Sequence, residues 1–371
     1  MAQGPHKVDV IVVGAGIAGA SLAARLAGKA SVLVLEMEAQ PGYHTSGRSA
    51  ATYEPTYGPP VIRELTTASG AFFHAPPEGF AASPLLAQRG CIAVGDPNDD
   101  VLAKEAIELG YRRASFAEAA ARLPLLRQGA AHILFDDNVW DADVEALLRG
   151  FLGQHRRAGG MLLTAGRLEA GKRADGVWRL STSAGDCEAP IVVDAAGAWA
   201  DDVARRCGLT ALGLTPKRRS VCIVPAPPGV GVANWPLLIS LGNSFFAKPT
   251  GGKLMISPFD AVPSEPHDAF ADDLLLAEGI DAYQQIVDHE VTRIERSWGG
   301  LRTFATDGDP VVGFDPAADG FFWCAGQGGY GIQTSPALSE VAAALVLGKP
   351  MPLGLPAQTA DQISPARLRK A

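Results

Sequence analysis

The sequence predicts an α/β protein in which a Rossmann-like dinucleotide-binding domain is interleaved with an α+β domain built on an antiparallel sheet. Three observations support this prediction. The chain opens with a strand, a glycine-rich turn, a helix and a second strand, and two further strand-to-glycine turns occur near residues 197 and 326. Segments rich in short strands separate these three stretches. This order is expected when one domain is interrupted twice by pieces of another.

The opening stretch places a G-x-G-x-x-G fingerprint in the context that gives the motif its meaning. Residues 8–13 form an apolar run that predicts a buried strand, and residues 20–28 have helical character. A second apolar strand over residues 31–35 ends at Glu36. A strand before the glycines, a helix after them and an acidic residue at the end of the next strand are typical of dinucleotide-binding units.

Each fingerprint residue has a physical task in this prediction. Gly14 permits the tight turn, Gly16 lets the backbone approach a pyrophosphate, and Gly19 allows the helix to pack closely on the strand. The helix N-terminus offers free N–H groups to the phosphates. The Glu36 carboxylate accepts hydrogen bonds from ribose hydroxyls and repels a 2′-phosphate, so FAD or NAD is favoured over NADP.

Composition excludes several classes of function. The chain has 371 residues, of which 47% are hydrophobic and 19% charged, which is enough for two domains with a large core. The net charge of −8 argues against a nucleic-acid partner. Five cysteines without a C-x-x-C pair favour reduced thiols and a cytoplasmic location. No apolar run reaches about 18 residues, so no membrane span is expected, and no metal site is predicted.

The remaining elements are predicted from apolar periodicity and from turn residues. Helices are expected over residues 61–73, 101–109, 116–122, 143–157, 201–207 and 336–347. Strands are expected over residues 85–94, 161–168, 178–183, 187–195, 220–224, 237–240, 244–248, 254–257 and 321–325. The predicted dinucleotide-binding domain comprises residues 1–52, 132–215 and 300–371, and the predicted substrate-binding domain comprises residues 53–131 and 216–299.

Six segments carry a resemblance to a known family: residues 14–21, 38–44, 47–51, 216–220, 300–302 and 327–335. Over nearly its whole length the chain resembles the D-amino-acid oxidase-like family of FAD-dependent amine oxidoreductases, which includes glycine and sarcosine oxidases. Within that family it is most similar to the D-arginine dehydrogenases. The resemblance implies two domains and noncovalently bound FAD, because residues 302–307 lack the cysteine through which sarcosine oxidases attach flavin.

The resemblance also implies which residues bind FAD. The fingerprint and the segment that runs along the pyrophosphate towards the isoalloxazine supply Gly14, Gly16, Ile17, Ala18, Gly19, Glu36, Thr45, Ser46, Gly47, Arg48, Ser49, Ala50 and Ala51. The later turns supply Leu168, Gly197, Gly328, Tyr330, Gly331, Ile332 and Gln333. Arg48 either pairs with a phosphate, which we favour, or is a surface charge. The helix after the last glycines aims its N–H groups at the negative charge that develops at flavin N1–O2 on reduction.

Two arginines are the predicted anchors of a substrate carboxylate, because the planar guanidinium fork binds both oxygens. They are Arg219 and Arg302, and the alternative for either is a structural ion pair. The resemblance implies that the Gly329 carbonyl accepts a hydrogen bond from the substrate amine. Tyr53 and Tyr57 lie in a segment that resembles an active-site lid, with Tyr57 as its gate residue; an ordinary surface loop is the alternative.

Three positions depart from the D-arginine dehydrogenase pattern. Thr52 stands where the family has a histidine near flavin N5, Cys91 replaces a glutamate that pairs with a cationic side chain, and Phe246 replaces a carboxylate-binding tyrosine. Thr52 either holds a water or contributes nothing. Loss of the glutamate leaves a buried guanidinium without a partner, so we expect a substrate with a neutral, apolar side chain.

The predicted reaction is FAD-dependent oxidative deamination of a D-amino acid to a 2-oxo acid and ammonia. The α-carbon gives a hydride to flavin N5 while the deprotonated amine donates its lone pair towards the α-carbon. The electron acceptor is left open among a quinone, another carrier and oxygen. The alternatives are oxidation of an N-alkyl glycine or a 2-hydroxy acid, a reductase that takes hydride from NAD(P)H, a plain NAD dehydrogenase, and a non-catalytic FAD-binding subunit.

Overall fold

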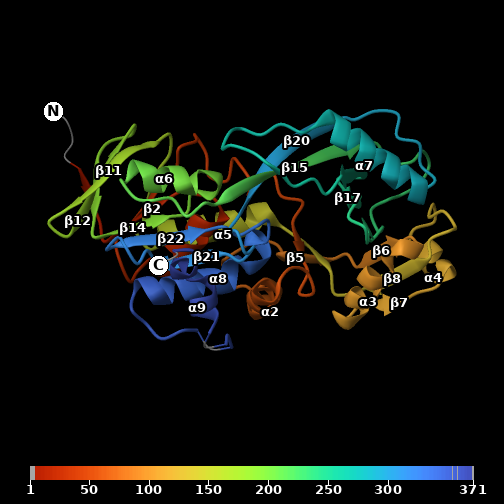
Figure 1. Ribbon diagram of the computed structural model, residues 1–371, viewed down its shortest axis with the longest axis horizontal. Helices are drawn as coiled ribbons and strands as arrows, with labels where there is room; N and C mark the ends of the chain where they lie inside the picture. The colour runs from red at the N-terminus through yellow and green to blue at the C-terminus, as the bar shows by residue number, and fades with distance from the viewer. Residues whose placement is uncertain (1–4, 353, 357, 370–371) are drawn as a thin grey trace.

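The computed structural model describes residues 5–352, 354–356 and 358–369 (Figure 1). Its helices and strands form an elongated molecule with one main sheet towards each end (Figure 1). The predicted mixed α/β fold with several sheets is therefore confirmed. Among the described residues, none of the helices combines the length and the apolar character that crossing a bilayer requires.

The first main sheet has six strands in the order β10-β3-β2-β14-β22-β21. Their bounds are β2 (Val10–Val13), β3 (Val32–Leu35), β10 (Met161–Leu163), β14 (Ile191–Asp194), β21 (Val311–Phe314) and β22 (Phe321–Ala325). Neighbours are parallel from β10 to β22, and β21 is antiparallel. Because β2 and β3 are entirely buried runs of Val, Ile and Leu, they suit a parallel sheet covered on both faces.

Different layers cover the two faces of this sheet. On one face β2 and β3 share a core with helices α1 (Ile17–Leu26), α2 (Pro60–His74) and α8 (Gly331–Val346). On the other face they share a core with α6 (Ala200–Arg206) and a four-stranded sheet. The strands of that smaller sheet are β1 (His6–Lys7), β11 (Leu168–Ala174), β12 (Val177–Thr182) and β13 (Cys187–Ala189). Helix α5 (Val144–Arg157) packs against α1.

The second main sheet is mostly antiparallel and runs β19-β15-β18-β17-β16-β6-β8-β7, with β20 also paired to β15. Its strands are β6 (Cys91–Gly95), β7 (Arg112–Arg113), β8 (His132–Asp136), β15 (Thr215–Val224), β16 (Leu237–Ser240), β17 (Phe246–Thr250), β18 (Lys253–Ser257), β19 (Val262–Pro263) and β20 (Arg296–Phe304). The β15·β20 pair is its longest antiparallel ladder. Helices α3 (Asp100–Glu108), α4 (Phe116–Arg122) and α7 (Asp273–Ile286) flank this sheet (Figure 1).

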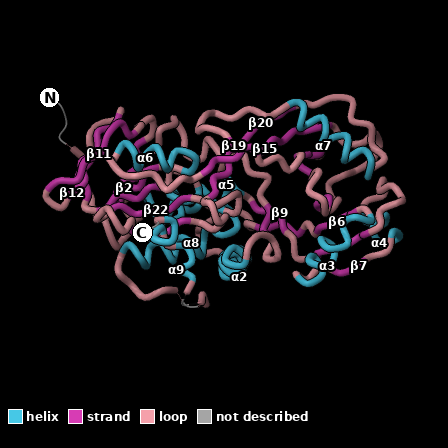
Figure 2. The backbone as a smooth tube through the Cα atoms, viewed as in Figure 1, coloured by secondary structure: helices cyan, strands magenta, loops and turns pink. Residues whose placement is uncertain are grey.

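A small sheet lies between the two main sheets, where Figure 2 shows β9. It joins β4 (Thr52–Tyr53), β9 (Trp140–Ala142) and β5 (Leu86–Gln88), all antiparallel. Helix α9 (Thr359–Ile363) packs near β21 at the C-terminal end of the chain. Because β8 pairs with β6 and β20 pairs with β15, both strands belong to the second sheet. The domain boundaries at residues 53, 132, 216 and 300 stay a prediction.

Several predicted elements have the predicted bounds, and α4, β16 and β22 match residue for residue. Three long predicted strands are each divided. Gly90, with a φ of +67°, separates β5 from β6, and Ala165, with a φ of +53°, lies between β10 and β11. Pro190 separates β13 from β14, which belong to different sheets, because proline cannot donate to a ladder.

Two helices differ from the prediction. Helix α8 begins at Gly331 and not at Pro336, so Pro336 lies inside the helix. Proline has no N–H to donate to the Ile332 carbonyl, and Ser335 Oγ donates to that carbonyl instead, at 3.0 Å. Helix α7 was not predicted at all. Its signal is Asp272, whose carboxylate accepts from the N–H groups of Leu274 and Leu275 and caps the first turn.

Candidate functional site

A first cavity lies at the carboxyl ends of β2, β3 and β14 and encloses about 830 Å³. Ligands of open α/β sheets bind at this edge of the strands. The predicted residues that line it are Gly14, Gly16, Glu36, Thr45, Ser46, Leu168 and Gly197. The fold therefore brings residues from four segments of the chain to one cavity.

Packing explains why glycine stands at two fingerprint positions. A Cβ on Gly14 would lie 2.5 Å from the Ala195 carbonyl oxygen, and its φ of +105° already disfavours other residues. A Cβ on Gly19 would lie 1.9 Å from the Gly14 carbonyl oxygen. Close approach of α1 to β2 and β14 thus requires both glycines, as the fingerprint predicts.

The Glu36 carboxylate is held at the cavity by two backbone donors. Its Oε2 accepts from the Ala15 N–H at 2.8 Å and its Oε1 from the Glu38 N–H at 2.9 Å. The side chain is buried, yet it borders the cavity. Because each oxygen retains a lone pair, the carboxylate can still accept from ribose hydroxyls.

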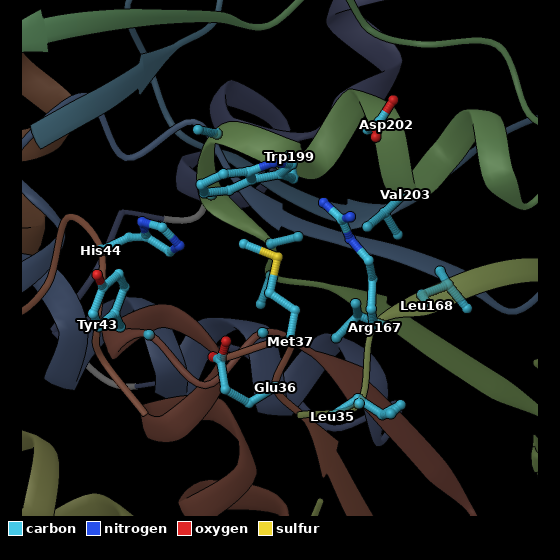
Figure 3. A pocket seen from close by; sticks show the side chains of 18 of the residues that line it. Leu35, Glu36, Met37, Tyr43, His44, Arg167, Leu168, Trp199, Asp202 and Val203 are labelled. Carbon is cyan, nitrogen blue, oxygen red and sulfur yellow. The ribbon is translucent and has the colours of Figure 1, made fainter. Parts of the chain in front are cut away.

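The sequence analysis missed several large side chains of this cavity, among them Met37, His44, Arg167 and Trp199. Figure 3 shows Met37 between Glu36 and Trp199, with Arg167 beside it. The rings of His44 and Trp199 lie 4.5 Å apart at one wall. These side chains come from separate loops and carry no motif, so only the fold reveals them.

A second cavity encloses about 1040 Å³ and lies between the two main sheets. Thr45 lines both cavities, so the segment after Glu36 connects them. The predicted residues that line the second cavity are Thr45, Arg48, Ser49, Ala50, Ala51, Thr52, Tyr57, Arg219, Phe246, Arg302, Gly329, Tyr330, Ile332 and Gln333. Most of the predicted flavin-side and substrate residues therefore meet at one place.

The register of β15 and β20 brings the two arginines together. Lys217 lies opposite Arg302 in this antiparallel pair, so Arg219, two residues further along, projects from the same face. Burial and the charge of Arg302 together lower the pKa of Arg219 to about 10. The two neighbouring guanidinium groups are partly buried and line one cavity, an arrangement that suits an anion.

The arginine partners leave room for an anion. Arg219 Nε donates to the Asp260 carbonyl at 2.7 Å, and its guanidinium stacks 5.0 Å from the ring of Phe259. Arg302 Nε is buried and, among the described residues, has no hydrogen-bond partner. Asp260 Oδ1 lies 3.8 Å from Arg219 Nε, too far for a hydrogen bond.

The glycine-rich loop before α8 closes against Arg302. A Cβ on Gly329 would lie 2.5 Å from Arg302 Cδ, and both Gly328 and Gly329 have a positive φ. The ring of Tyr330 packs 5.1 Å from that of Tyr57, and burial raises the pKa of Tyr330. The predicted gate residue Tyr57 is therefore in contact with the loop, on the cavity wall.

Some predicted residues lie elsewhere. Tyr53 is buried in the core, where its ring packs 5.2 Å from that of Phe73. Cys91 is fully buried in β6, 3.9 Å from the Tyr111 hydroxyl, and lines neither cavity. Ile17, Ala18, Gly19, Gly47, Gly328 and Gly331 also lie behind the cavity walls.

Arg48 borders the second cavity, but its guanidinium is engaged by protein groups. It donates to Asp268 Oδ1 at 2.5 Å and to the carbonyls of Tyr43, Ala269 and Gly299. These contacts were not predicted, and the phosphate contact of Arg48 stays a prediction.

Two ionisable residues of the second cavity were missed. Lys248 is buried and pairs with Asp141 at 2.7 Å. Glu54 is 6% exposed, and burial raises its pKa to about 7. The sequence analysis predicted a lid from Tyr53 and Tyr57 in this segment and gave Glu54 between them no role.

Comparison with known proteins places the chain in a family. The profile of the family described as "FAD dependent oxidoreductase" matches residues 9–345, so the chain belongs to this family. Glycine oxidase of Geobacillus kaustophilus is 26% identical over 92% of this chain and 93% of its own length. Its crystal structure superposes with a TM-score of 0.80 at 22% identity, covering 93% of this chain and 96% of that chain.

Two further proteins are similar to this chain. The L-proline dehydrogenase structure from P. horikoshii has a TM-score of 0.83 at 21% identity and covers 98% of both chains. FAD-dependent oxidoreductase domain-containing protein 1 of Xenopus laevis is 30% identical over 43% of this chain. That match spans only 35% of the Xenopus protein's length. The finer resemblance to D-arginine dehydrogenases stays a prediction.

FAD is the cofactor of this family, and the residues present fit it. The first cavity offers the fingerprint turn and Glu36 to a nucleotide half. The second offers the glycine loop at Gly329 and the α8 N-terminus to a flavin half. Thr45, which borders both, lies where the two halves join.

Proposed function

We propose that this protein uses FAD to oxidise the Cα–N bond of an amino acid, with D-amino acids as the primary substrate class. The pair of partly buried arginines, Arg219 and Arg302, beside the loop at Gly329 is the observation that carries the proposal. A substrate carboxylate would balance these two like charges. The names of the similar glycine oxidase and L-proline dehydrogenase also support an amino-acid substrate.

In the proposed complex, Arg219 and Arg302 bind the substrate carboxylate, and the Gly329 carbonyl accepts a hydrogen bond from the amine. The apolar side chains of Val221 and Leu237 line the same cavity and exclude water from the α-carbon. FAD, when bound, supplies the acceptor at N5 for the hydride from the α-carbon. The amine enters the step deprotonated, and the imino acid that results hydrolyses to a 2-oxo acid and ammonia.

The side-chain preference rests on the walls of the second cavity. Phe246 offers no hydrogen bond to a carboxylate, and Val221, Leu237 and Ile239 add further apolar surface. These walls support the predicted preference for neutral side chains. Cys91 does not line the cavity and carries no part of the argument.

A second candidate substrate is glycine or an N-alkyl glycine. The similarity to glycine oxidase over 92% of this chain favours it. A 2-hydroxy acid would use the same arginines but would not need the amine acceptor at Gly329. The electron acceptor stays open among a quinone, another carrier and oxygen. Five free, buried cysteines support the predicted reducing, cytoplasmic environment.

Anaerobic stopped-flow spectroscopy of the FAD-loaded protein tests the proposal. The panel comprises D- and L-amino acids, glycine, sarcosine, 2-hydroxy acids and NADH. We expect neutral D-amino acids to bleach the flavin band fastest. Bleaching by sarcosine or a hydroxy acid alone would replace the substrate and keep the carboxylate anchor. Silence towards the whole panel would favour the non-catalytic FAD-binding subunit.

A further inference from the structure

Glu54 is a carboxyl group on the second cavity to which the proposed reaction gives no role. Along the extended segment 52–54, Thr52 and Glu54 line the cavity, whereas Tyr53 between them is buried in the core. This alternation is the ordinary geometry of a strand. Glu54 is the only acidic side chain among the described residues that line this cavity.

The surroundings of Glu54 contain no positive partner. Its Oε1 accepts a hydrogen bond from the Tyr111 hydroxyl at 2.9 Å. Among the described residues, the other titratable groups that face it are Cys91 and Asp136. Asp136 is itself buried, with Oδ2 accepting from Thr56 at 2.9 Å. A buried carboxyl beside a second carboxyl needs either a proton or a cation.

The charge environment agrees with this geometry. Burial raises the pKa of Glu54 to about 7, the Tyr111 hydrogen bond opposes the rise, and the charge of Asp136 adds to it. Lys248, also on the cavity, is paired with Asp141.

The cavity therefore combines basic and acidic groups. Arg219 and Arg302 bring positive charge to the cavity, and Glu54, which is hydrogen-bonded to Tyr111, brings a carboxyl group to it. Val221, Leu237 and Phe246 line the same cavity and supply the apolar surface along which methylene groups can pack. An amino acid whose carboxylate sits on the arginines can direct its side chain towards Glu54.

We propose that Glu54 determines which substrate side chains the cavity accepts. Its carboxyl group receives a hydrogen bond from a side chain that is a donor, and it binds a cationic side chain with release of its own proton. The inference rests on the proposed function, because it takes the arginines as the carboxylate anchor. In proton balance, the Glu54 carboxylic acid and the ligand cation give a carboxylate–cation pair and one proton in the solvent. While Glu54 keeps its proton, its carboxyl group is uncharged and tolerates neutral side chains.

The sign of the pH dependence follows. Binding a cation stabilises ionised Glu54, so affinity for a cationic ligand rises with pH and levels off above about pH 7. Below that pH the affinity falls about tenfold per unit. A side-chain ammonium keeps its own charge up to about pH 10. A neutral ligand of the same shape lacks this dependence, and the α-amine titrates equally in both ligands.

Dead-end ligands separate this binding step from turnover. 2-Methyllysine and 2-methylnorleucine share the α-carboxylate, the α-amine and the chain length, and neither carries an α-hydrogen that could leave as a hydride. Each enantiomer is titrated calorimetrically into the FAD-loaded protein, in two buffers of different ionisation enthalpy. We expect 2-methyllysine to release about one more proton than 2-methylnorleucine near pH 6, and almost none above about pH 8.

Three variants test the residue itself. Glu54→Gln should abolish the difference in proton release and lower the preference for 2-methyllysine above pH 7 by about ten- to one-hundred-fold. Tyr111→Phe removes a hydrogen bond that favours ionised Glu54, so the pH midpoint should rise. Asp136→Asn removes a repelling charge, so the midpoint should fall. A merely structural role for these residues would not move the midpoint in opposite directions.

The outcomes distinguish the two proposals. Equal affinity and equal proton release for the two ligands would overturn the role of Glu54 and leave the proposed function standing. Preference for 2-methyllysine that survives in Glu54→Gln would also overturn it. If neither ligand binds, in the parent or in any variant, the carboxylate anchor is removed and with it both proposals.

Discussion

Replacing Arg302 by methionine is expected to separate activity from stability. The Arg302 guanidinium lines the second cavity, and its Nε is buried without a hydrogen-bond partner among the described residues. Its charge also lowers the pKa of Arg219. The variant removes a partly buried cation that repels Arg219 and has an unpaired Nε, so the free energy of unfolding of the substrate-free protein should stay near that of the parent or rise.

The loss of activity can be estimated from the contacts that the guanidinium offers. A bidentate arginine–carboxylate pair makes two charge-assisted hydrogen bonds, each contributing about 1.5–3 kcal/mol. Losing both costs about 3–6 kcal/mol of substrate binding, which corresponds to roughly a hundred- to ten-thousand-fold in kcat/KM. Arg219 remains as a single anchor, so some binding should persist.

Arg218→Met is the matched control. Arg218 is the neighbour of Arg219 in β15, but its guanidinium pairs with Asp272 at 2.7 Å and does not line the cavity. Loss of this partly exposed pair should cost at most about 1 kcal/mol of stability. Arg218 Nε also lies 3.7 Å from Oδ2 of the buried Asp260, so the total loss of stability should be larger, with kcat/KM near that of the parent. Anaerobic flavin reduction and thermal unfolding are measured for both variants. A kcat/KM for Arg302→Met within about threefold of the parent, or an equal loss in Arg218→Met, would refute the assignment.

Three further predictions concern the cofactor. Gly14→Ala should lose FAD, measured as the ratio of flavin to protein absorbance, because its Cβ would lie 2.5 Å from the Ala195 carbonyl oxygen; retained FAD would contradict the packing argument. Glu36→Gln leaves one acceptor oxygen where two now serve the N–H groups of Ala15 and Glu38, so the Kd for FAD should rise about tenfold; an unchanged Kd would count against this role. Acid precipitation should release all the flavin into the supernatant, whereas yellow colour in the pellet would show a covalent link.

The nucleotide half of the site was predictable because its determinants are local. The fingerprint glycines, the strand that ends at Leu35 and the acid at Glu36 lie within one strand–helix–strand unit. Steric limits on Gly14 and Gly19 leave the sequence few alternatives there. The arginines were predictable by resemblance, and the register of β15 and β20 gives the physical reason that they converge.

The acidic part of the second cavity was not predictable, because it depends on contacts between distant segments. Glu54 meets Tyr111 only through the packing of the small sheet against β6 and β8. Cys91 was placed on the cavity by its sequence position, but a strand sends alternate side chains to opposite faces, and this one enters the core. The contacts of Arg48 were not predictable either, because no local pattern shows the three carbonyls and Asp268 that surround it.

The charges of the second cavity define the polarity of its ligand. Among the described residues four cations line it, but Arg48 is neutralised by Asp268 and Lys248 by Asp141. Of these four, Arg219 and Arg302 remain available to an incoming anion. Glu54 has only the Tyr111 hydroxyl, so a ligand that is anionic at one end and a hydrogen-bond donor at the other complements both. A purely apolar side chain satisfies only the first of these demands, and it does so without penalty only while Glu54 keeps its proton.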